Sequence, residues 1–219
     1  MKNTKYHNNL SQGLASIALA LVILLLPLII VAKSFPIYQW QFSVNKTYEE
    51  FGSKDLVEEK GKEIIKYLNG KIASLDNQFF SEQARLHMYD VQQLFLIAKI
   101  STVLLALLFL VFLWWNLLQQ NNASISSVLI YGGVGASIVM GFACIGVLFF
   151  WDVFFVKFHT TFFMNDLWLF PASDSLVRLF PEQFFVMLSS LAIGGSLLAS
   201  GFSILSGLLL KIRYTISTH

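Results

Sequence analysis

The 219-residue sequence contains one cysteine, Cys144, and few charged residues. A single cysteine excludes an internal disulfide bond and any metal site built from several cysteines. Cys144 lies in the middle of an apolar run, where a thiol most often packs as a small hydrophobic group, so we expect no cysteine nucleophile. Charged residues make up 13% of the chain, about half the share found in soluble domains.

Common catalytic motifs are absent as well. The chain has no G-x-S-x-G elbow, no H-E-x-x-H motif and no phosphate-binding loop. The net charge of +2 is too small to indicate a nucleic-acid partner. Hydrophobic residues, by contrast, make up 56% of the sequence, which excludes an ordinary soluble domain.

Four apolar runs are long enough to cross a bilayer, which takes about 20 helical residues. The first follows Lys2 and Lys5, but its apolar part is too long for a signal peptide and no A-x-A cleavage site follows it. We predict an all-α membrane protein that forms one integral membrane domain over residues 1–219. Its four transmembrane helices are expected at about 13–33, 94–118, 126–150 and 183–210.

The segment 34–93, between the first two predicted transmembrane helices, is polar. Eight of the fifteen basic residues and most of the acidic ones fall between Lys33 and Gln93. Lys54–Leu68 has one apolar helical face, and Asn69-Gly70 can end that helix. Ser81 can cap a second helix that runs on into the next span. We therefore predict a small, mainly helical extracytoplasmic cap.

Few charges decide the orientation. They are Lys2, Lys5, Lys211 and Arg213 in the two tails, against Lys157 and Arg178 in the loop 151–182. The excess of positive charge favours a cytoplasmic location for both tails. The cap and the loop 151–182, which we call the outer aromatic loop, then share the outer face.

Small residues recur every four positions in the third and fourth predicted transmembrane helices. Because residues four apart share a helix face, these stripes favour close packing between helices. The stripes are Gly133, Ser137 and Gly141, then Gly195, Ala199, Ser203 and Gly207.

The outer aromatic loop contains a lone histidine, His159, within the densest aromatic run of the chain. Aromatic residues at helical spacing form an apolar stripe beside it. We predict that aromatic side chains here line a substrate pocket: Phe155, Phe158, Phe162 and Trp168. An interfacial aromatic belt with an incidental histidine is the alternative.

A second histidine, His87, lies in the predicted cap on the same side of the membrane. Asp90 is three residues further on, so its carboxylate shares a helix face with the imidazole and can orient or charge it. Tyr89 is a further supporting candidate on this helix. In the outer loop, Arg178 can hold a carboxylate, such as that of Asp174, or a lipid or peptide carbonyl group. The alternatives are a solvated residue for His87 and a lipid head-group contact for Arg178.

His87, Asp90 and His159 could also form a three-ligand metal site with an open position. Nothing in their spacing requires it, and we expect neither a metal ion nor a cofactor. The remaining histidines, His7 and His219, lie near the chain ends and are expected to be solvated and inert.

Two blocks of the sequence carry a resemblance to a known family. They are SEQARLHMYDVQQLF at 81–95 and, further on, FHTTFF at 158–163 with WLFPASDSLVRLFPEQFF at 168–185. The chain resembles the lipoprotein intramolecular transacylases (Lit) of low-GC Gram-positive bacteria over essentially its whole length. Where that family commonly has N-W-x-F-D-P, this chain has N-D-L-W-L-F-P, so no role is carried onto Asn165 or Asp166.

The resemblance implies an acyltransferase of the bacterial cell membrane with its active site on the extracytoplasmic face. It implies that the sn-2 acyl chain of a diacylglyceryl-modified lipoprotein moves to the α-amine of its own N-terminal cysteine, which leaves the lyso form. His87 and His159 correspond to the family's two catalytic histidines. The expected partners are such lipoproteins and membrane lipid, with no nucleic acid, and we expect a monomer.

The residues agree with this chemistry, because an intramolecular transfer supplies its own nucleophile. The α-amine has a pKa of about 7.7–8.0, so a histidine is a suitable base for its proton, and a second imidazole can donate to the oxyanion. Either histidine could take either role. The alternative functions are a metal-dependent membrane hydrolase that uses His87, Asp90 and His159, and a non-enzymatic membrane scaffold.

Overall fold

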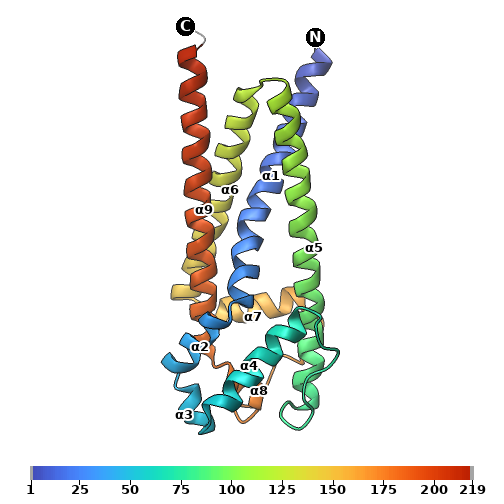
Figure 1. Ribbon diagram of the computed structural model, residues 1–219, viewed down its shortest axis with the longest axis vertical. Helices are drawn as coiled ribbons and strands as arrows, with labels where there is room; N and C mark the ends of the chain where they lie inside the picture. Colours follow the sequence, from blue (N-terminus) through green and yellow to red (C-terminus); the bar gives the residue numbers. More distant parts are fainter. Residues whose placement is uncertain (1, 218–219) are drawn as a thin grey trace. The chain divides into compact units, whose positions relative to one another are not determined.

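The structure, a computed structural model, describes residues 2–217 and the side chains of residues 9–216. Within this range the chain is helical and has no strand (Figure 1). Its helices are α1 (Lys2–Lys33), α2 (Phe35–Val44), α3 (Thr47–Phe51), α4 (Lys54–Leu68), α5 (Glu82–Leu118), α6 (Asn122–Phe149), α7 (Trp151–Phe162), α8 (Ser175–Leu179) and α9 (Glu182–Ser217).

Four of these helices are long and apolar enough to cross a membrane. In the described part of the chain they cover Asn9–Lys33, Glu82–Leu118, Asn122–Phe149 and Glu182–Ile216. The 37 residues of α5 rise about 55 Å, more than the roughly 30 Å of a hydrocarbon core, so only part of α5 can lie in lipid. The predicted all-α membrane fold is confirmed, and the ends of the spans stay predictions.

The chain forms two compact units. The first comprises residues 1–28, 99–144 and 192–219, and the second comprises residues 29–98 and 145–191. In the first unit, segments of α1, α5, α6 and α9 pack around a core of small and aliphatic side chains with Phe112. Hydroxyl groups also join the helices, because Ser126 Oγ donates to the Gly207 carbonyl and Ser203 Oγ donates to the Leu129 carbonyl, both at 2.8 Å.

The small residues of the first unit allow α6 and α9 to approach closely, as the sequence predicts. A Cβ atom at Gly133 would lie 2.7 Å from Ile204 Cγ1, and one at Gly207 would lie 2.7 Å from Ile130 Cγ1. Gly195 instead faces Pro27 of α1, and a Cβ atom at Gly141 would meet nothing within 4 Å. The stripe prediction is therefore wrong at Gly141, where the helix face is open.

The second unit is built around α4. Ser53 Oγ caps α4 by accepting the Leu56 N–H at 3.2 Å, and Gly70 follows its end with φ +70°. Only glycine adopts this left-handed conformation without strain, so the predicted helix and its end are both accounted for. The buried core of this unit comprises Tyr38, Phe42, Val57, Ile64, Tyr67, Leu68, Leu75, Phe80, Ala84, Met88, Leu176, Leu179, Phe180 and Phe184.

A buried lysine fastens α4 to the segment that leads into α5. Lys60 is 5% exposed, and its Nζ lies 2.7 Å from the Asp76 carboxylate and 3.1 Å from the Glu63 carboxylate. The hydrogen bond from Lys60 holds the pKa of Asp76 below its usual range. Ser81 then begins α5 by accepting the Ala84 N–H at 3.1 Å, as predicted.

Candidate active site

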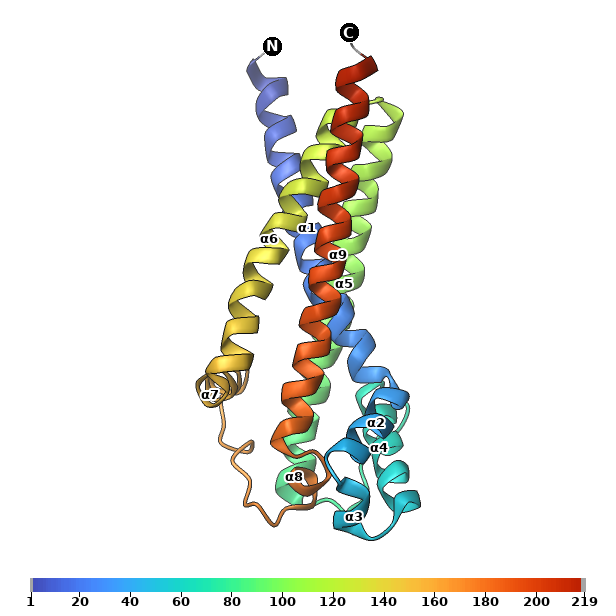
Figure 2. The same ribbon diagram turned by 90° about the vertical axis from the view of Figure 1, so that its left-hand side faces the viewer.

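The two central histidines come together within the second unit. His87 lies on α5 and His159 on α7, whose axis is steeply inclined to the amino-terminal part of α5 (Figures 1 and 2). Their ring centroids are 6.0 Å apart, and the side chains are only 7% and 8% exposed. This burial excludes the alternative that His87 is a solvated residue.

Aromatic rings surround both imidazoles. Around His159 the ring centroids of Phe155, Trp168 and Phe158 lie at 4.0, 4.9 and 5.4 Å, and Trp168 stacks on the imidazole with an interplanar angle of 28°. Phe162, the fourth aromatic residue of the predicted pocket, is 52% exposed and packs on Phe158 instead.

Two further aromatic residues, which the sequence interpretation missed, contact the histidines. Phe163 lies 5.2 Å from His87 and 5.6 Å from His159, measured between ring centroids, and so bridges the pair. Phe170 lies 5.5 Å from His87. The i, i+4 spacing of His159 and Phe163 was a usable signal, whereas Phe170 lies in a loop and no periodicity points to it.

The tautomer of neutral His159 follows from its hydrogen bond. Its Nδ1 atom lies 2.8 Å from the carbonyl oxygen of Phe155, one helical turn earlier. A carbonyl oxygen only accepts, so Nδ1 carries the proton and Nε2 keeps a free lone pair. Burial lowers the pKa of His159, opposed by the hydrogen bond to Phe155, so the imidazole is largely neutral near pH 7.

In His87 the other ring nitrogen, Nε2, carries the proton of the neutral imidazole. Its Nδ1 atom is buried and has no hydrogen-bond partner in the described part of the chain. A buried N–H group without a partner is rarer in proteins than an acceptor without one, so the favoured tautomer carries its proton on Nε2. The pair therefore combines one imidazole able to accept a proton with one able to donate a hydrogen bond.

Asp90 has a hydrogen-bond partner that was not predicted. It lies one turn beyond His87, but its carboxylate Oδ2 accepts a hydrogen bond from Asn165 Nδ2 at 2.9 Å. Asp90 therefore binds the outer aromatic loop. Burial lowers the pKa of His87, and the charge of Asp90 opposes this lowering, as the predicted charge effect requires. Tyr89 is 55% exposed and, two residues from His87, points to the other side of the helix.

Arg178 holds a carboxylate, which was one of the predicted possibilities, but its partner is Glu50 and not Asp174. Arg178 Nε donates to Glu50 Oε1 at 2.8 Å, and its guanidinium carbon lies 4.9 Å from the centroid of the Phe51 ring. The Asp174 carboxylate caps α8 and accepts a 2.6 Å hydrogen bond from Ser81 Oγ. Both residues therefore join the outer loop to the cap.

The three-ligand metal arrangement is not formed. Across the described residues, no group of three or more histidine, cysteine, aspartate or glutamate side chains lies close enough to hold an ion. The physical reason at this site is that the Asp90 carboxylate binds the amide of Asn165.

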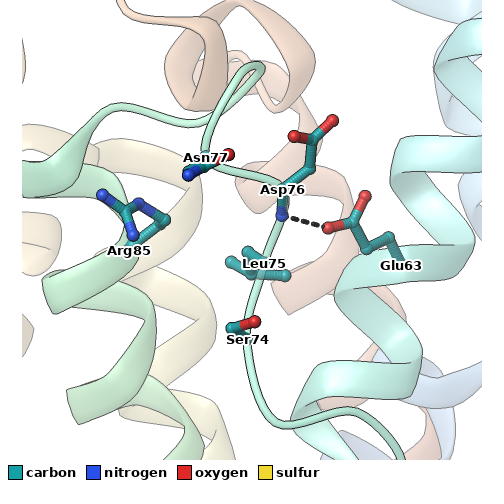
Figure 3. Close-up of a pocket in the computed structure, with 6 residues that line it drawn as sticks. All are labelled: Glu63, Ser74, Leu75, Asp76, Asn77 and Arg85. Carbon is teal, nitrogen blue, oxygen red and sulfur yellow. Dashed lines mark hydrogen bonds between the residues drawn. The ribbon is translucent and has the colours of Figure 1, made fainter.

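A polar pocket of about 340 Å³ lies elsewhere in the second unit (Figure 3). Arg85 faces it, and because Arg85 precedes His87 by two residues, the pocket lies on the other side of α5 from the histidine pair. Within it, the Glu63 carboxylate accepts a hydrogen bond from the Asp76 backbone N–H, drawn dashed in Figure 3. The lining residues are Glu63, Ser74, Leu75, Asp76, Asn77 and Arg85.

The fold and the buried histidines define a helical integral membrane protein with a candidate acid–base pair. The family described as "Lipoprotein intramolecular transacylase Lit" matches residues 13–185. The chain belongs to this family of membrane acyltransferases. Comparison with curated proteins gave no significant match. His7 and His219, expected to be inert, lie outside the described side chains.

Solved structures support the fold. The in meso structure of the membrane integral lipoprotein intramolecular transacylase Lit from Bacillus cereus is 18% identical, with a TM-score of 0.89 over 97% of this chain and 99% of that one. A variant of that protein with a histidine replaced by arginine is 19% identical, with a TM-score of 0.83 over 99% and 97% of the chains. A second variant, with alanine, is 18% identical, with a TM-score of 0.81 over 98% of each chain.

Proposed function

We propose that His87 and His159 together catalyse transfer of the sn-2 acyl chain of a diacylglyceryl lipoprotein to the α-amine of its own N-terminal cysteine. One observation carries this proposal. Two buried imidazoles, 6.0 Å apart, offer complementary free nitrogens in a chain of the transacylase family. An enzyme that supplies only a base and an oxyanion donor suits a substrate that contains both the nucleophile and the ester.

In this mechanism His159 is the base. The α-ammonium group first loses one proton to solvent, and the neutral amine attacks the sn-2 ester carbonyl to form the new C–N bond. Nε2 of His159 takes the second proton from nitrogen in the tetrahedral intermediate. The ester C–O bond then breaks, and His159 returns this proton to the leaving glycerol oxygen. The products are an amide and a free sn-2 hydroxyl group, and no water is consumed.

His87 stabilises the intermediate. The Nε2–H group donates a hydrogen bond to the carbonyl oxygen as it gains negative charge. Removal of one such donor in other acyl-transfer enzymes costs about 100- to 1,000-fold in turnover. The low polarity of the surrounding rings strengthens this hydrogen bond, and by excluding water the rings favour transfer over hydrolysis.

We also propose that the site faces the outside of the cell membrane, with the lipid-modified cysteine as its partner. The distribution of lysine and arginine between the tails and the outer loop supports this orientation. The many half-exposed aliphatic and aromatic side chains of α7, including Val153 and Val156, suit contact with acyl chains.

The test replaces His159 by asparagine, which is polar but provides no base, and His87 by phenylalanine, which keeps a ring but provides no hydrogen-bond donor. His159→Asn and His87→Phe should each abolish formation of the lyso lipoprotein, measured by mass spectrometry of the N-terminal lipopeptide of a coexpressed reporter. His7→Asn, in the amino-terminal tail, is the matched control and should retain activity. Near-normal lyso product from either site variant would remove that histidine from the mechanism.

A further inference from the structure

One face of α5 holds the outer aromatic loop at two points on either side of His87. Gln83, His87 and Asp90 are spaced i, i+4 and i+7, so their side chains share a face of the helix. Asp90 accepts a hydrogen bond from Asn165 at 2.9 Å. Gln83 Nε2 donates to the carbonyl oxygens of Leu167 and Leu169 at 3.1 and 3.0 Å. The segment 165–170, which we call the strap, is thus tied across the face that carries His87.

The two carbonyl groups that Gln83 binds flank Trp168 in the chain. One side-chain amide therefore restrains the backbone on both sides of the indole that stacks on His159 at 4.9 Å. Phe170, at the end of the strap, contacts His87 at 5.5 Å. The strap consequently places one ring against each histidine.

The Asn165 side chain restrains the beginning of the strap in a similar way. Its Nδ2 atom donates to Asp90, while its Oδ1 atom accepts the Leu167 N–H at 3.1 Å. The latter bond forms a local turn, so the Asp90 contact fixes the position of this turn against α5. The strap lacks a regular helix or strand, and these side chains provide the restraint that a backbone ladder would otherwise supply.

We infer that Gln83 is a positioning residue of the acyl transfer, and that with the Asp90–Asn165 bond it holds the strap so that Trp168 and Phe170 fix the two imidazoles. The expected effect on turnover rests on the proposed function, whereas the restraint of the strap by Gln83 does not. A displacement of a reacting group by about 1 Å can reduce turnover roughly 100-fold. Loss of the strap should therefore lower turnover strongly without changing the identity of the product.

The first test removes the hydrogen bonds of Gln83 and keeps its volume. Gln83→Met is close in shape to glutamine but has no N–H donor. Gln92→Met is a matched control, because Gln92 also lies on α5 and donates to a backbone carbonyl, that of Tyr67. With fluorine-labelled tryptophan, the NMR resonance of Trp168 can be assigned among the five tryptophans by its loss in Trp168→Phe.

We expect Gln83→Met to shift or broaden the Trp168 resonance and to change its titration with pH, while Gln92→Met leaves both as in the wild type. This titration reports on His159 and on His87, whose ring centroid lies 6.0 Å away. Turnover should fall roughly 10- to 100-fold in Gln83→Met. A wild-type resonance and wild-type turnover in this variant would overturn the inference, and so would an equal response in Gln92→Met.

The second test exchanges the two side chains of the Asp90–Asn165 hydrogen bond. Asn165→Asp places two carboxylates against each other and should release the strap. Adding Asp90→Asn restores an amide–carboxylate pair, and the new carboxylate at position 165 can still accept the Leu167 N–H. We therefore expect the double variant to recover the Trp168 resonance and most of the turnover lost in Asn165→Asp. No recovery would show that this bond does not position the strap.

The outcomes separate this inference from the proposed function. If the histidine variants remain active, the proposed chemistry fails, yet the Trp168 resonance still decides whether Gln83 holds the strap. If the histidine variants are inactive and Gln83→Met behaves as the wild type in both readouts, only the positioning role fails.

Discussion

Removal of the Trp168 indole should make acyl transfer more sensitive to acid. The indole stacks on the His159 ring with centroids 4.9 Å apart, and burial lowers the pKa of His159, opposed by the Phe155 hydrogen bond. Burial has this effect because it deprives the imidazolium of hydration. Trp168→Ala admits water to one face of the ring, so the pKa of His159 should rise towards the ordinary value of about 6.5.

The sign and limit of the effect follow from the role of His159 as a base. Only the unprotonated imidazole can accept a proton, so a higher pKa leaves less active enzyme at low pH. With an ordinary pKa, about a quarter of the imidazoles would be unprotonated at about pH 6 and nearly all at about pH 8. The ratio of turnover at about pH 6 to that at about pH 8 should therefore fall in Trp168→Ala, by at most about fourfold relative to the wild type.

The assay is the initial rate of lyso lipopeptide formation, measured by mass spectrometry with purified protein in lipid nanodiscs. The substrate α-ammonium group titrates equally in both proteins, so the comparison of ratios isolates the histidine. Trp40→Ala, at a half-exposed tryptophan of α2, is the matched control and should keep the wild-type ratio. An unchanged ratio in Trp168→Ala, at whatever absolute rate, would refute the assignment of His159 as a base shielded by this indole.

Three other predictions follow from the packing and orientation. Lys60→Met leaves the partly exposed carboxylates of Glu63 and Asp76 without their cation and should reduce the free energy of unfolding in denaturant titrations near pH 7. Because its partner Asp76 has a lowered pKa, the difference in free energy of unfolding between Lys60→Met and the wild type should shrink as the pH falls below about 4. A difference that stays constant with pH would contradict the ion pairing. Gly133→Ala should cost about 1–3 kcal/mol in thermal unfolding, whereas Gly141→Ala, at an open position of the same helix, should change stability by less than about 0.5 kcal/mol. In a Cys144→Ser background, Lys66→Cys at an exposed cap position should react with an impermeant maleimide on intact cells. Labelling only after permeabilisation would show that the cap faces the cytoplasm and would contradict the proposed orientation.

Local signals predicted the parts of the fold that local chemistry determines. Helix α4 begins at Lys54 and ends at Leu68 as predicted, because Ser53 and the Asn69-Gly70 pair act within the neighbouring turns. Ser81 likewise caps α5. The four apolar runs predicted the membrane helices, since a bilayer imposes length and composition directly.

The surroundings of the histidines were less predictable because they depend on long-range contacts. Helical spacing correctly placed Asp90 on the face of His87, but it could not show that the carboxylate binds Asn165, 75 positions further along the chain. Asp174, four residues away, was one possible partner of Arg178 in the sequence, whereas Arg178 pairs with Glu50 from another helix. Gln83 carries no charge and belongs to no motif, so only the folded strap identifies its partners.

The most direct test of the proposed chemistry is to follow labelled acyl chains in a mixture of two substrates. Two synthetic diacylglyceryl lipopeptides, which differ both in peptide sequence and in the length of the sn-2 chain, are incubated together with the enzyme. Mass spectrometry of the products should show each peptide N-acylated with its own former sn-2 chain and still carrying its sn-1 ester. Exchange of chains between the peptides, transfer of the sn-1 chain, or release of free fatty acid in place of N-acylation would contradict an intramolecular sn-2 to amine transfer.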